Sequence, residues 1–369
     1  MRTEALPSGA EGAAGVSAGA PVLVPVLENH RFDEAALARY LAGRLPGFSG
    51  GRLEVRQFQG GQSNPTFHLR AGDGSFVLRK KPPGKLLPSA HAVEREYRIM
   101  AALAESGVPV PVMRLLCEDP EVIGTAFFVM DSVPGRVFPD RVLRGLPPAE
   151  TAAIYDDMAR VLAALHRVDW RAAGLADFGK AEGYMRRQVA RWTRQWEAAK
   201  VEDMPAMDLL AEWLPRHLPE DDETAIAHGD FRLGNVIIHP TEPRIAAVLD
   251  WELATLGHPL ADLGYACLTY HMPPGASGAT GLLGTEFSGT GIPDQPEFVA
   301  RYCRAAGRPP PDGLDVFVVF SMFRLASIVA GVWRRALDGN AADPRAIGYR
   351  ERYRGMAEGA WAIAQRIGA

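Results

Sequence analysis

The chain contains one cluster of residues whose types and spacing suit chemistry on a phosphate group. Residues 228–235 read His-Gly-Asp-Phe-Arg-Leu-Gly-Asn, and an acidic stretch, Val-Leu-Asp-Trp-Glu, follows at 248–252. Asp230 can accept the proton of an attacking hydroxyl, and Asn235 can bind Mg²⁺ through its amide oxygen. Asp250, expected at the end of the next strand, can bridge metal ions that neutralise nucleotide phosphates. This order and spacing predict transfer of a phosphoryl group from ATP with Mg²⁺.

Short β-prone segments before this cluster predict a sheet. Residues 53–58 alternate between apolar and polar side chains, and Gly72-Asp73-Gly74 is a hairpin signal between 66–70 and 75–79. The apolar run at 127–130 is consistent with a buried strand.

Apolar residues at helical spacing predict helices around and after this sheet. The expected helices span residues 33–45, 92–103, 151–166, 184–200, 313–337 and 350–367. In the second half of the chain, clear strand signals occur at 236–238 and 245–249. The expected fold class is therefore α+β, with a small β-rich lobe before a larger, mainly helical lobe.

These elements divide the chain into three expected parts. Residues 1–28, which are mostly Ala, Gly, Pro and Val, predict a flexible tail. Residues 29–133 would form a nucleotide-binding lobe, and 134–369 a catalytic and acceptor-binding lobe, with the hinge at 131–134.

Composition excludes several classes of protein. A net charge of −4 over 369 residues gives no reason to expect a nucleic-acid or membrane partner. Cys117, Cys267 and Cys303 are few and widely spaced, which argues against a disulfide framework and favours a reducing cytoplasm. No secretory signal is recognisable, and no apolar run approaches the about 20 residues of a membrane span. We expect a cytoplasmic protein, and the sequence does not indicate an oligomeric state.

The motifs, taken in order, resemble those of the aminoglycoside phosphotransferase and choline kinase-like family, which has the two-lobe protein-kinase-like fold. The resemblance covers roughly residues 30–340 and is closer to the branch of kinase-like domains fused to acyl-CoA dehydrogenases. Besides the phosphate-chemistry cluster, it rests on three stretches, 60–66, 77–84 and 257–263. It implies a small-molecule kinase that uses ATP and Mg²⁺ and phosphorylates a hydroxyl group.

The resemblance assigns a role to most of the cluster. Asp230 would be the catalytic base, and Asn235 and Asp250 would hold Mg²⁺. Asp262 would brace the catalytic loop without touching the substrate. Gly234 departs from the family pattern, because many relatives carry a polar residue, often Asp, at this position.

The resemblance also assigns nucleotide contacts in the first lobe. A phosphate-covering turn would consist of Gly60, Gly61, Gln62 and Ser63, which lack the Gly-rich pattern of protein kinases. Adenine would pair with the backbones of Asp131 and Val133 beside the side chain of Met130.

A cation on the third strand would contact the phosphates and pair with an acidic residue of the following helix. Period-two alternation places Arg79 on the same face as Val77, so Arg79 is the favoured cation, with Lys80 or Lys81 as alternatives. Its favoured partner is Glu96, with Glu94 as the alternative.

Two further sets of residues allow other interpretations. Asp177-Phe178-Gly179 has the letters of the protein-kinase metal motif, but it precedes the catalytic loop, so a turn is expected there. His228, His239 and His258 have no usual zinc spacing, so a metal-dependent hydrolase is disfavoured and a structural role for His228 is expected. A catalytically silent nucleotide-binding protein of the same fold is the remaining alternative.

The helix expected at 184–200 carries the main signal about the acceptor. Arg187, Arg191 and Arg194 share one face, while Trp192 and Trp196 form an i, i+4 pair. A solvated basic face over a Trp-anchored core is the simpler reading. The hypothesis is that the arginines bind an anionic acceptor such as a hydroxyacyl-CoA, which would make a cationic aminoglycoside a less suitable acceptor.

Overall fold

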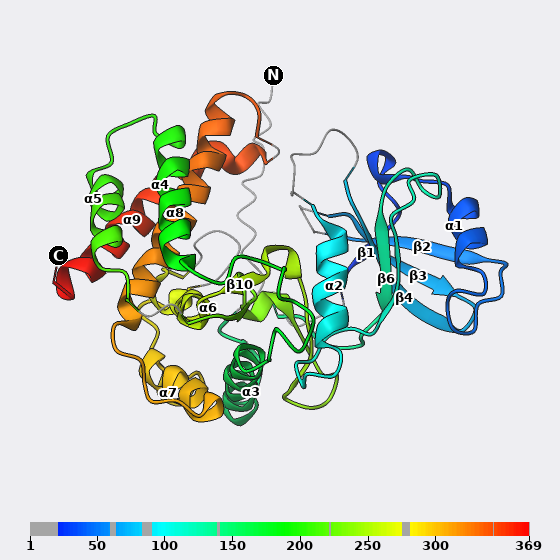
Figure 1. Ribbon diagram of the computed structural model, residues 1–369, viewed down its shortest axis with the longest axis horizontal. Coiled ribbons are helices and arrows are strands. Elements are labelled where there is room, and N and C mark those ends of the chain that lie inside the picture. Colours follow the sequence, from blue (N-terminus) through cyan, green and yellow to red (C-terminus); the bar gives the residue numbers. More distant parts are fainter. Residues whose placement is uncertain are drawn as a thin grey trace, which may run out of the picture.

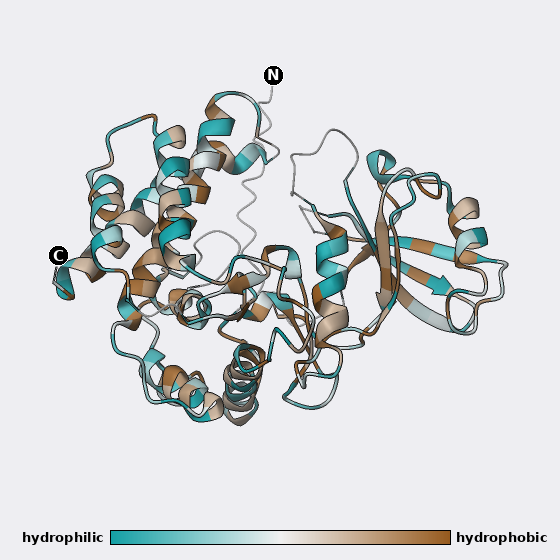
Figure 2. Ribbon diagram, viewed as in Figure 1, coloured by the Kyte–Doolittle hydropathy of each residue, from teal (hydrophilic) through white to brown (hydrophobic). Residues whose placement is uncertain are grey.

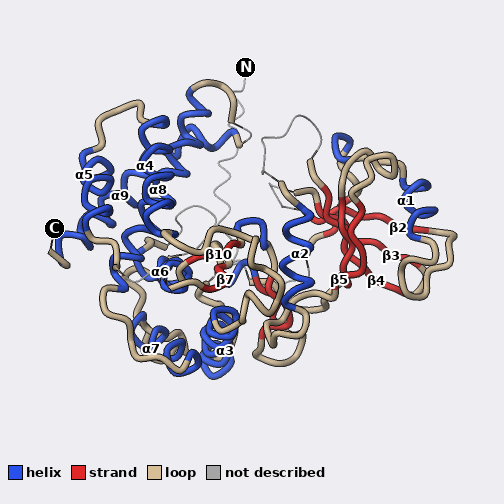
Figure 3. The backbone as a smooth tube through the Cα atoms, in the orientation of Figure 1, coloured by secondary structure: helices blue, strands red, loops and turns tan. Residues whose placement is uncertain are grey.

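The computed structural model describes residues 21–59, 64–82, 91–138, 141–220, 223–274, 281–341 and 343–368. A sheet with two helices and a larger helical region lie side by side (Figures 1 and 3). This is the α+β arrangement that the sequence predicts. The predicted phosphate-covering turn at 60–63 lies outside the described residues.

The first region is built on a six-stranded antiparallel sheet with the order β1-β2-β3-β4-β6-β5. The strands are β1 (Leu23–Val24), β2 (Leu53–Phe58), β3 (Thr66–Ala71), β4 (Gly74–Lys80), β5 (Met113–Cys117) and β6 (Phe127–Asp131). In Figure 2, β6 is coloured apolar over most of its length, as expected for a strand with neighbours on both edges.

A helix covers each face of this sheet. On one face, α1 (Glu34–Leu41) packs against apolar side chains that include Leu78. On the other, α2 (Val93–Leu103) packs against Val77 and Met130. Because adjacent residues of a strand face opposite ways, Arg79 lies on the α2 side with Val77.

The predicted tail at 1–28 is wrong in its last part. Leu23 pairs with Phe58, and Val24 pairs with Gln57, so β1 is an edge strand of the sheet. The side chain of Gln57 accepts a hydrogen bond from the Leu27 N–H and holds the chain beyond β1 as well. Composition did not reveal this strand because two residues are too few for a period-two pattern.

The second region is mainly helical. Its helices are α3 (Pro148–His166), α4 (Tyr184–Ala199), α5 (Pro205–Trp213), α6 (Pro259–Cys267), α7 (Gln295–Ala306), α8 (Leu314–Leu337) and α9 (Arg350–Arg366). Short 3₁₀ helices lie at Glu28–His30, Leu214–Arg216, Leu233–Asn235, Trp251–Leu253, Leu268–His271 and Pro344–Tyr349.

Two small antiparallel pairs are set among these helices. One consists of β7 (Ala225–Ala227) and β10 (Thr255–Gly257), and the other of β8 (Val236–Ile238) and β9 (Ile245–Val248). The sequence predicts the β8–β9 pair but not the β7–β10 pair.

The helix α8 is long and apolar enough to cross a membrane by length and composition alone, which the sequence analysis did not anticipate. In the fold, 72% of its most apolar window is buried. Its side chains share one core with those of α4, α6 and α9. Its apolar composition is explained by this packing.

Candidate active site

The pairing of β8 with β9 brings the predicted metal ligands to one place. Asn235 directly precedes β8, and Asp250 follows β9 by two residues. Val236 lies opposite Val248, and the Leu249 N–H donates to the Asn235 carbonyl over 2.8 Å. Residues 15 positions apart in sequence therefore meet at the same end of a hairpin.

The carboxylate of Asp230 is held by three side chains. Asn235 Nδ2 donates to Asp230 Oδ2 over 2.7 Å, and the Tyr265 hydroxyl donates to Oδ1 over 2.5 Å. Arg232 Nε lies 3.2 Å from Oδ1. Burial is the main cause that raises the pKa of Tyr265, followed by the negative charge of Asp230, so the phenol stays protonated and donates. No motif identifies Tyr265 in the sequence, because it lies 35 residues after Asp230 on α6.

Gly234, which departs from the family pattern, lies next to the flexible end of the Arg232 side chain. A Cβ atom at position 234 would lie 2.4 Å from Arg232 Nη1. The missing side chain therefore leaves room for the guanidinium group beside Asp230.

Asp262 of α6 braces the loop that carries Asp230, as predicted. Its two carboxylate oxygens accept the backbone N–H groups of His228 (2.6 Å) and Gly229 (2.8 Å). Burial opposes ionisation of this carboxyl, but hydrogen bonds from His166 and from the Gly229 N–H hold its pKa below the usual range. Asp262 is therefore a charged anchor for two consecutive backbone amides.

His228 has the structural role that was expected. Its Nδ1 accepts the N–H of Asp230 at 3.2 Å, and its Nε2 donates to the Leu249 carbonyl at 2.9 Å. Since both ring nitrogens are used, this imidazole has no lone pair to offer a zinc ion. His258 caps α6 by accepting the Leu260 N–H, which is also a structural role.

Arg79 of β4, the predicted phosphate-binding cation, faces the β8–β9 hairpin from the sheet. Arg79 Nε lies 3.1 Å from Glu96 Oε2, and Arg79 Nη2 lies 2.8 Å from Asp250 Oδ1. Glu252 is a third carboxylate within 3.7 Å of Arg79. Burial, reinforced by the negative charges of Asp250 and Glu252 and opposed by Arg79, raises the pKa of Glu96 to about 7. One arginine is thus shared by three acidic side chains.

The alternative lysines lie elsewhere. Lys81 Nζ pairs with Glu94 at 2.9 Å. Lys80 is buried on the α1 side, with its Nζ 5.8 Å from the centre of the Phe32 ring, and burial lowers its pKa. Of the three candidate cations, Arg79 is the one that lines the cavity described next.

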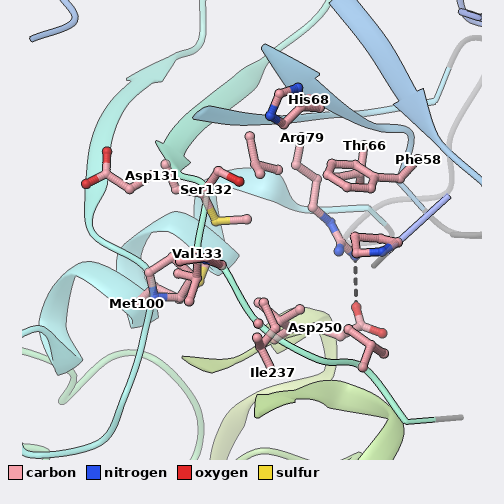
Figure 4. A pocket seen from close by; sticks show the side chains of 18 of the residues that line it. Phe58, Thr66, His68, Arg79, Met100, Asp131, Ser132, Val133, Ile237 and Asp250 are labelled. Carbon is pink, nitrogen blue, oxygen red and sulfur yellow. Dashed lines mark hydrogen bonds and ion pairs between the residues drawn. The ribbon is translucent and has the colours of Figure 1, made fainter. Parts of the chain in front are cut away.

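A cavity of 470 Å³ lies between the sheet and the β8–β9 hairpin, and it is lined by Arg79 and Asp250, which are hydrogen-bonded to each other (Figure 4). Met130, Asp131 and Val133 line it, as the resemblance implies. The Asp131 N–H already donates to the Val112 carbonyl over 2.9 Å, so the group that Asp131 can offer a base is its carbonyl oxygen.

Sequence reasoning missed 15 of the 21 residues that line the cavity. The missed side chains come from the edge strands, the centre of the sheet, α2 and the hairpin: Pro21, Leu23, Phe58, Thr66, His68, Val77, Met100, Pro111, Phe128, Ser132, Pro134, Gly135, Val137, Ile237 and Leu249. Most are apolar, as in pockets that take a flat aromatic ring. Apolar wall residues follow from sheet register, which a sequence motif does not record.

The basic face of α4 is present. Arg186, Arg191 and Arg194 are exposed, while Trp196 is buried, so the Trp-anchored core is also present. Arg187 Nη2 donates to the Lys180 carbonyl over 2.5 Å. The face continues onto α8 through Arg324, whose guanidinium lies 5.7 Å from the Trp192 ring and 5.4 Å from the Tyr265 ring.

A β-rich lobe, a helical lobe and a loop-and-hairpin site between them define the protein-kinase-like class. The chain belongs to the phosphotransferase enzyme family, whose model matches residues 54–317. It is 46% identical over 350 residues to acyl-CoA dehydrogenase family member 10 of Mus musculus, a match that covers 95% of this chain and 33% of that protein. The chain thus spans about a third of the length of this curated relative.

Solved structures agree with this placement. A proposed aminoglycoside phosphotransferase from Ralstonia eutropha matches with a TM-score of 0.83 at 46% identity, over 91% of this chain and 99% of that one. An aminoglycoside phosphotransferase in complex with AMP-PNP and hygromycin B shares the fold, with a TM-score of 0.58 at 16% identity over 89% and 99% of the two chains. The predicted family and fold class are confirmed.

Proposed function

We propose that this protein is a cytoplasmic small-molecule kinase that transfers the γ-phosphate of ATP to a hydroxyl group with the help of Mg²⁺. The observation that carries the proposal is the hydrogen bond between Asp230 and Asn235 at the start of the β8–β9 hairpin. At the other strand of this hairpin, Asp250 lines a 470 Å³ cavity together with Arg79 and Glu96. A base, two oxygen ligands and a phosphate-binding cation form the set that phosphoryl transfer requires. Three unpaired cysteines support a reducing compartment.

The donor set suits Mg²⁺. The amide nitrogen of Asn235 donates to both the carbonyl and the carboxylate of Asp230, so its amide oxygen is the atom left for a metal ion. Asp250 offers a carboxylate that is one-third exposed. Hard oxygen ligands of this kind are those that Mg²⁺ prefers. When bound there, Mg²⁺ would neutralise charge on the nucleotide phosphates.

The chain's own groups account for the remaining steps. Asp230 would accept a hydrogen bond from the acceptor hydroxyl and take its proton, while Tyr265 and Asn235 fix the orientation of the carboxylate. Arg79, anchored by Glu96, would attract the nucleotide phosphates. Catalysis would come mainly from positioning and charge stabilisation.

The acceptor is proposed to be anionic, with a hydroxyacyl-CoA or related metabolite as the leading candidate. Arg232 and Arg324 lie around Tyr265 and Asp230, and the basic face of α4 adjoins them. Acyl-CoA occurs in the name of the mouse relative. A cationic aminoglycoside would meet repulsion from these arginines, so antibiotic modification is disfavoured.

The test is ATP consumption by the purified chain with Mg²⁺ and a panel of hydroxylated metabolites. Asp230→Asn keeps the size of the side chain but removes the base, so acceptor-stimulated ADP release should fall by more than about a hundredfold with an unchanged melting temperature. Full activity of this variant would refute the assignment of the base.

One observation favours the alternative, a catalytically silent nucleotide-binding protein. The guanidinium of Arg79 contacts Asp250 directly, which places a cation on a proposed metal ligand. The two proposals differ in one measurement. A silent protein would bind Mg-ATP without consuming it in the presence of any acceptor in the panel.

A further inference from the structure

Arg141, at the entrance to the helical region, has an unusual environment for an arginine. It is 9% exposed, and no described residue accepts a hydrogen bond from its guanidinium or forms an ion pair with it. Arg136, five residues earlier, shows the usual arrangement. It donates to the Glu150 carboxylate (2.6 Å) and to the carbonyls of His239 and Glu242.

An unpaired buried cation is costly, and the cost is visible here. Burial is the main cause that lowers the pKa of Arg141. The charge of Arg232 lowers it further, while Tyr265, Tyr155 and Asp230 oppose the shift. Buried charges in proteins are normally paired and hydrogen-bonded. A fold that keeps Arg141 in this position therefore suggests a partner that binds from outside.

Arg141 lines a small cavity next to Tyr265 and Arg232, two residues that contact the Asp230 carboxylate. The cavity is 20 Å³ in volume, and its polar lining includes Arg141, Arg232, Tyr265 and Thr269. Thr269 Oγ1 is buried with no hydrogen-bond partner in the described part of the chain. The space admits one water-sized group, which matches a single oxygen atom.

The cations near Tyr265 share few carboxylates. The Tyr265 hydroxyl donates to Asp230, and the cations that act on this region are Arg141, Arg232 and Arg324. Asp230 already pairs with Arg232, while Arg141 forms no ion pair with a described residue. An anion bound here would supply Arg141 with a negative partner.

We propose that Arg141 and Thr269 form a subsite for one oxygen atom of an anionic group on the acceptor, next to the hydroxyl that Asp230 activates. This inference rests on the proposed function. It narrows the acceptor to a hydroxylated molecule with a carboxylate or phosphate group close to the reacting hydroxyl. It therefore favours a metabolite related to a hydroxyacyl-CoA over the thioester itself, whose acyl carbonyl is uncharged. A hydroxycarboxylate and a phosphate ester offer the same chemistry, and the experiment separates them.

The experiment measures the binding of small probes by calorimetry to the full chain saturated with Mg²⁺ and AMP-PNP, which occupies the phosphate site. Acetate and methyl phosphate are the anionic probes, and acetamide is the neutral control with the shape of acetate. A charge-assisted hydrogen bond from a buried guanidinium predicts that Arg141→Met weakens an anionic probe at least about tenfold. Acetamide binding should be unaffected.

Arg304→Met is the matched control, because Arg304 is an exposed arginine on α7. Loss of acetate binding alone in Arg141→Met assigns the subsite to a carboxylate, and loss of methyl phosphate binding alone assigns it to a phosphate. The inference is overturned if Arg141→Met binds each anion as tightly as Arg304→Met does, or if the unmodified chain binds neither anion. ATP turnover is not measured, so failure here leaves the proposed function standing.

Thr269→Val keeps the inference testable if Arg141→Met does not fold. Valine has the shape of threonine without the hydroxyl, so the fold should be retained. Anion binding should weaken about threefold or more because one donor is lost. Unchanged anion binding in Thr269→Val would contradict the proposed place of the oxygen atom.

Discussion

Several tripeptides of this chain begin with an aspartate followed by an aromatic residue, and two of them have different functions in the fold although both resemble a metal-binding motif. Asp177-Phe178-Gly179 lies in a turn after α3, and Asp250-Trp251-Glu252 follows β9. The Asp177 side chain is 75% exposed and pairs with Arg98 of α2. Asp250 has a left-handed backbone (φ 65°), and its side chain lines the cavity between the sheet and the β8–β9 hairpin.

Both tripeptides are contacted by arginines of the first lobe, but the two contacts lie in different places relative to the cavity. Arg95 and Arg98 of α2 reach Phe178 and Asp177 outside the cavity, whereas Arg79 of β4 reaches Asp250 inside it. The first contact joins the lobes, and the second places a cation and a carboxylate where phosphates are expected to bind. The two tripeptides are distinguished by their place in the fold, because only Asp250 closely follows a strand. Their similar amino-acid sequences do not distinguish them.

The largest predicted effect is on activity. Asp250→Ala removes a proposed metal ligand and should lower acceptor-stimulated ADP release by more than about a hundredfold. Asp177→Ala, the matched variant of the other tripeptide, should keep activity within about twofold. Both variants are measured with the same acceptor. Loss of activity in Asp177→Ala, with activity retained in Asp250→Ala, would show that the roles assigned to the two tripeptides are wrong.

The next effect is on stability and concerns Gly179. A Cβ at this position would lie 2.5 Å from Thr255 Oγ1 and 3.0 Å from the Leu256 nitrogen. Gly179→Ala should therefore lower the free energy of unfolding by about 1–3 kcal/mol, measured by urea denaturation. Gly355→Ala, on α9 with nothing within 4 Å of the added Cβ, is the control and should stabilise the protein slightly. Equal stability of the two variants would contradict the tight packing of Gly179.

Sequence reasoning located the centre of the site because its residues are close in sequence or follow a strand pattern. Asp230 and Asn235 share one loop, and strand alternation favoured Arg79 over Lys80. Tyr265 and Arg141 were missed, since their importance depends on where α6 and the segment before α3 pack. No local pattern contains that information.

The helices and strands that were not predicted also fall into two groups, those with a local sequence signal and those without one. The helix α7 has readable signals, with Asp294 accepting the Glu297 N–H at its start and Gly307 in a left-handed conformation at its end. The pair β7–β10 consists of three-residue strands, which are too short for any periodicity. The first could have been predicted, and the second depends on tertiary pairing.

A smaller effect concerns Glu96, the buried acidic partner of Arg79, and the dependence of stability on pH. The folded-state pKa of Glu96 is raised to about 7 from 4.5, so the unfolded chain releases this proton first as the pH rises. Stability from this group is fully present below pH 4.5 and is lost as the pH rises through 7. Glu96→Gln, which cannot ionise, should flatten the fall in melting temperature between pH 5 and pH 8 without nucleotide. An equally steep fall in the variant would rule out Glu96 as its cause.

The smallest effect is that of the ion pair between Arg98 and Asp177. Both side chains are largely exposed, at 42% and 75%, so solvent screens their attraction. A double-mutant cycle with Arg98→Gln and Asp177→Asn should give only a small coupling free energy, which decreases further in salt. A strong coupling would mean that this ion pair, and not the packing of Phe178 against Arg95, fixes α2 to the helical lobe. The arginine contacts of the two tripeptides would then differ only in strength.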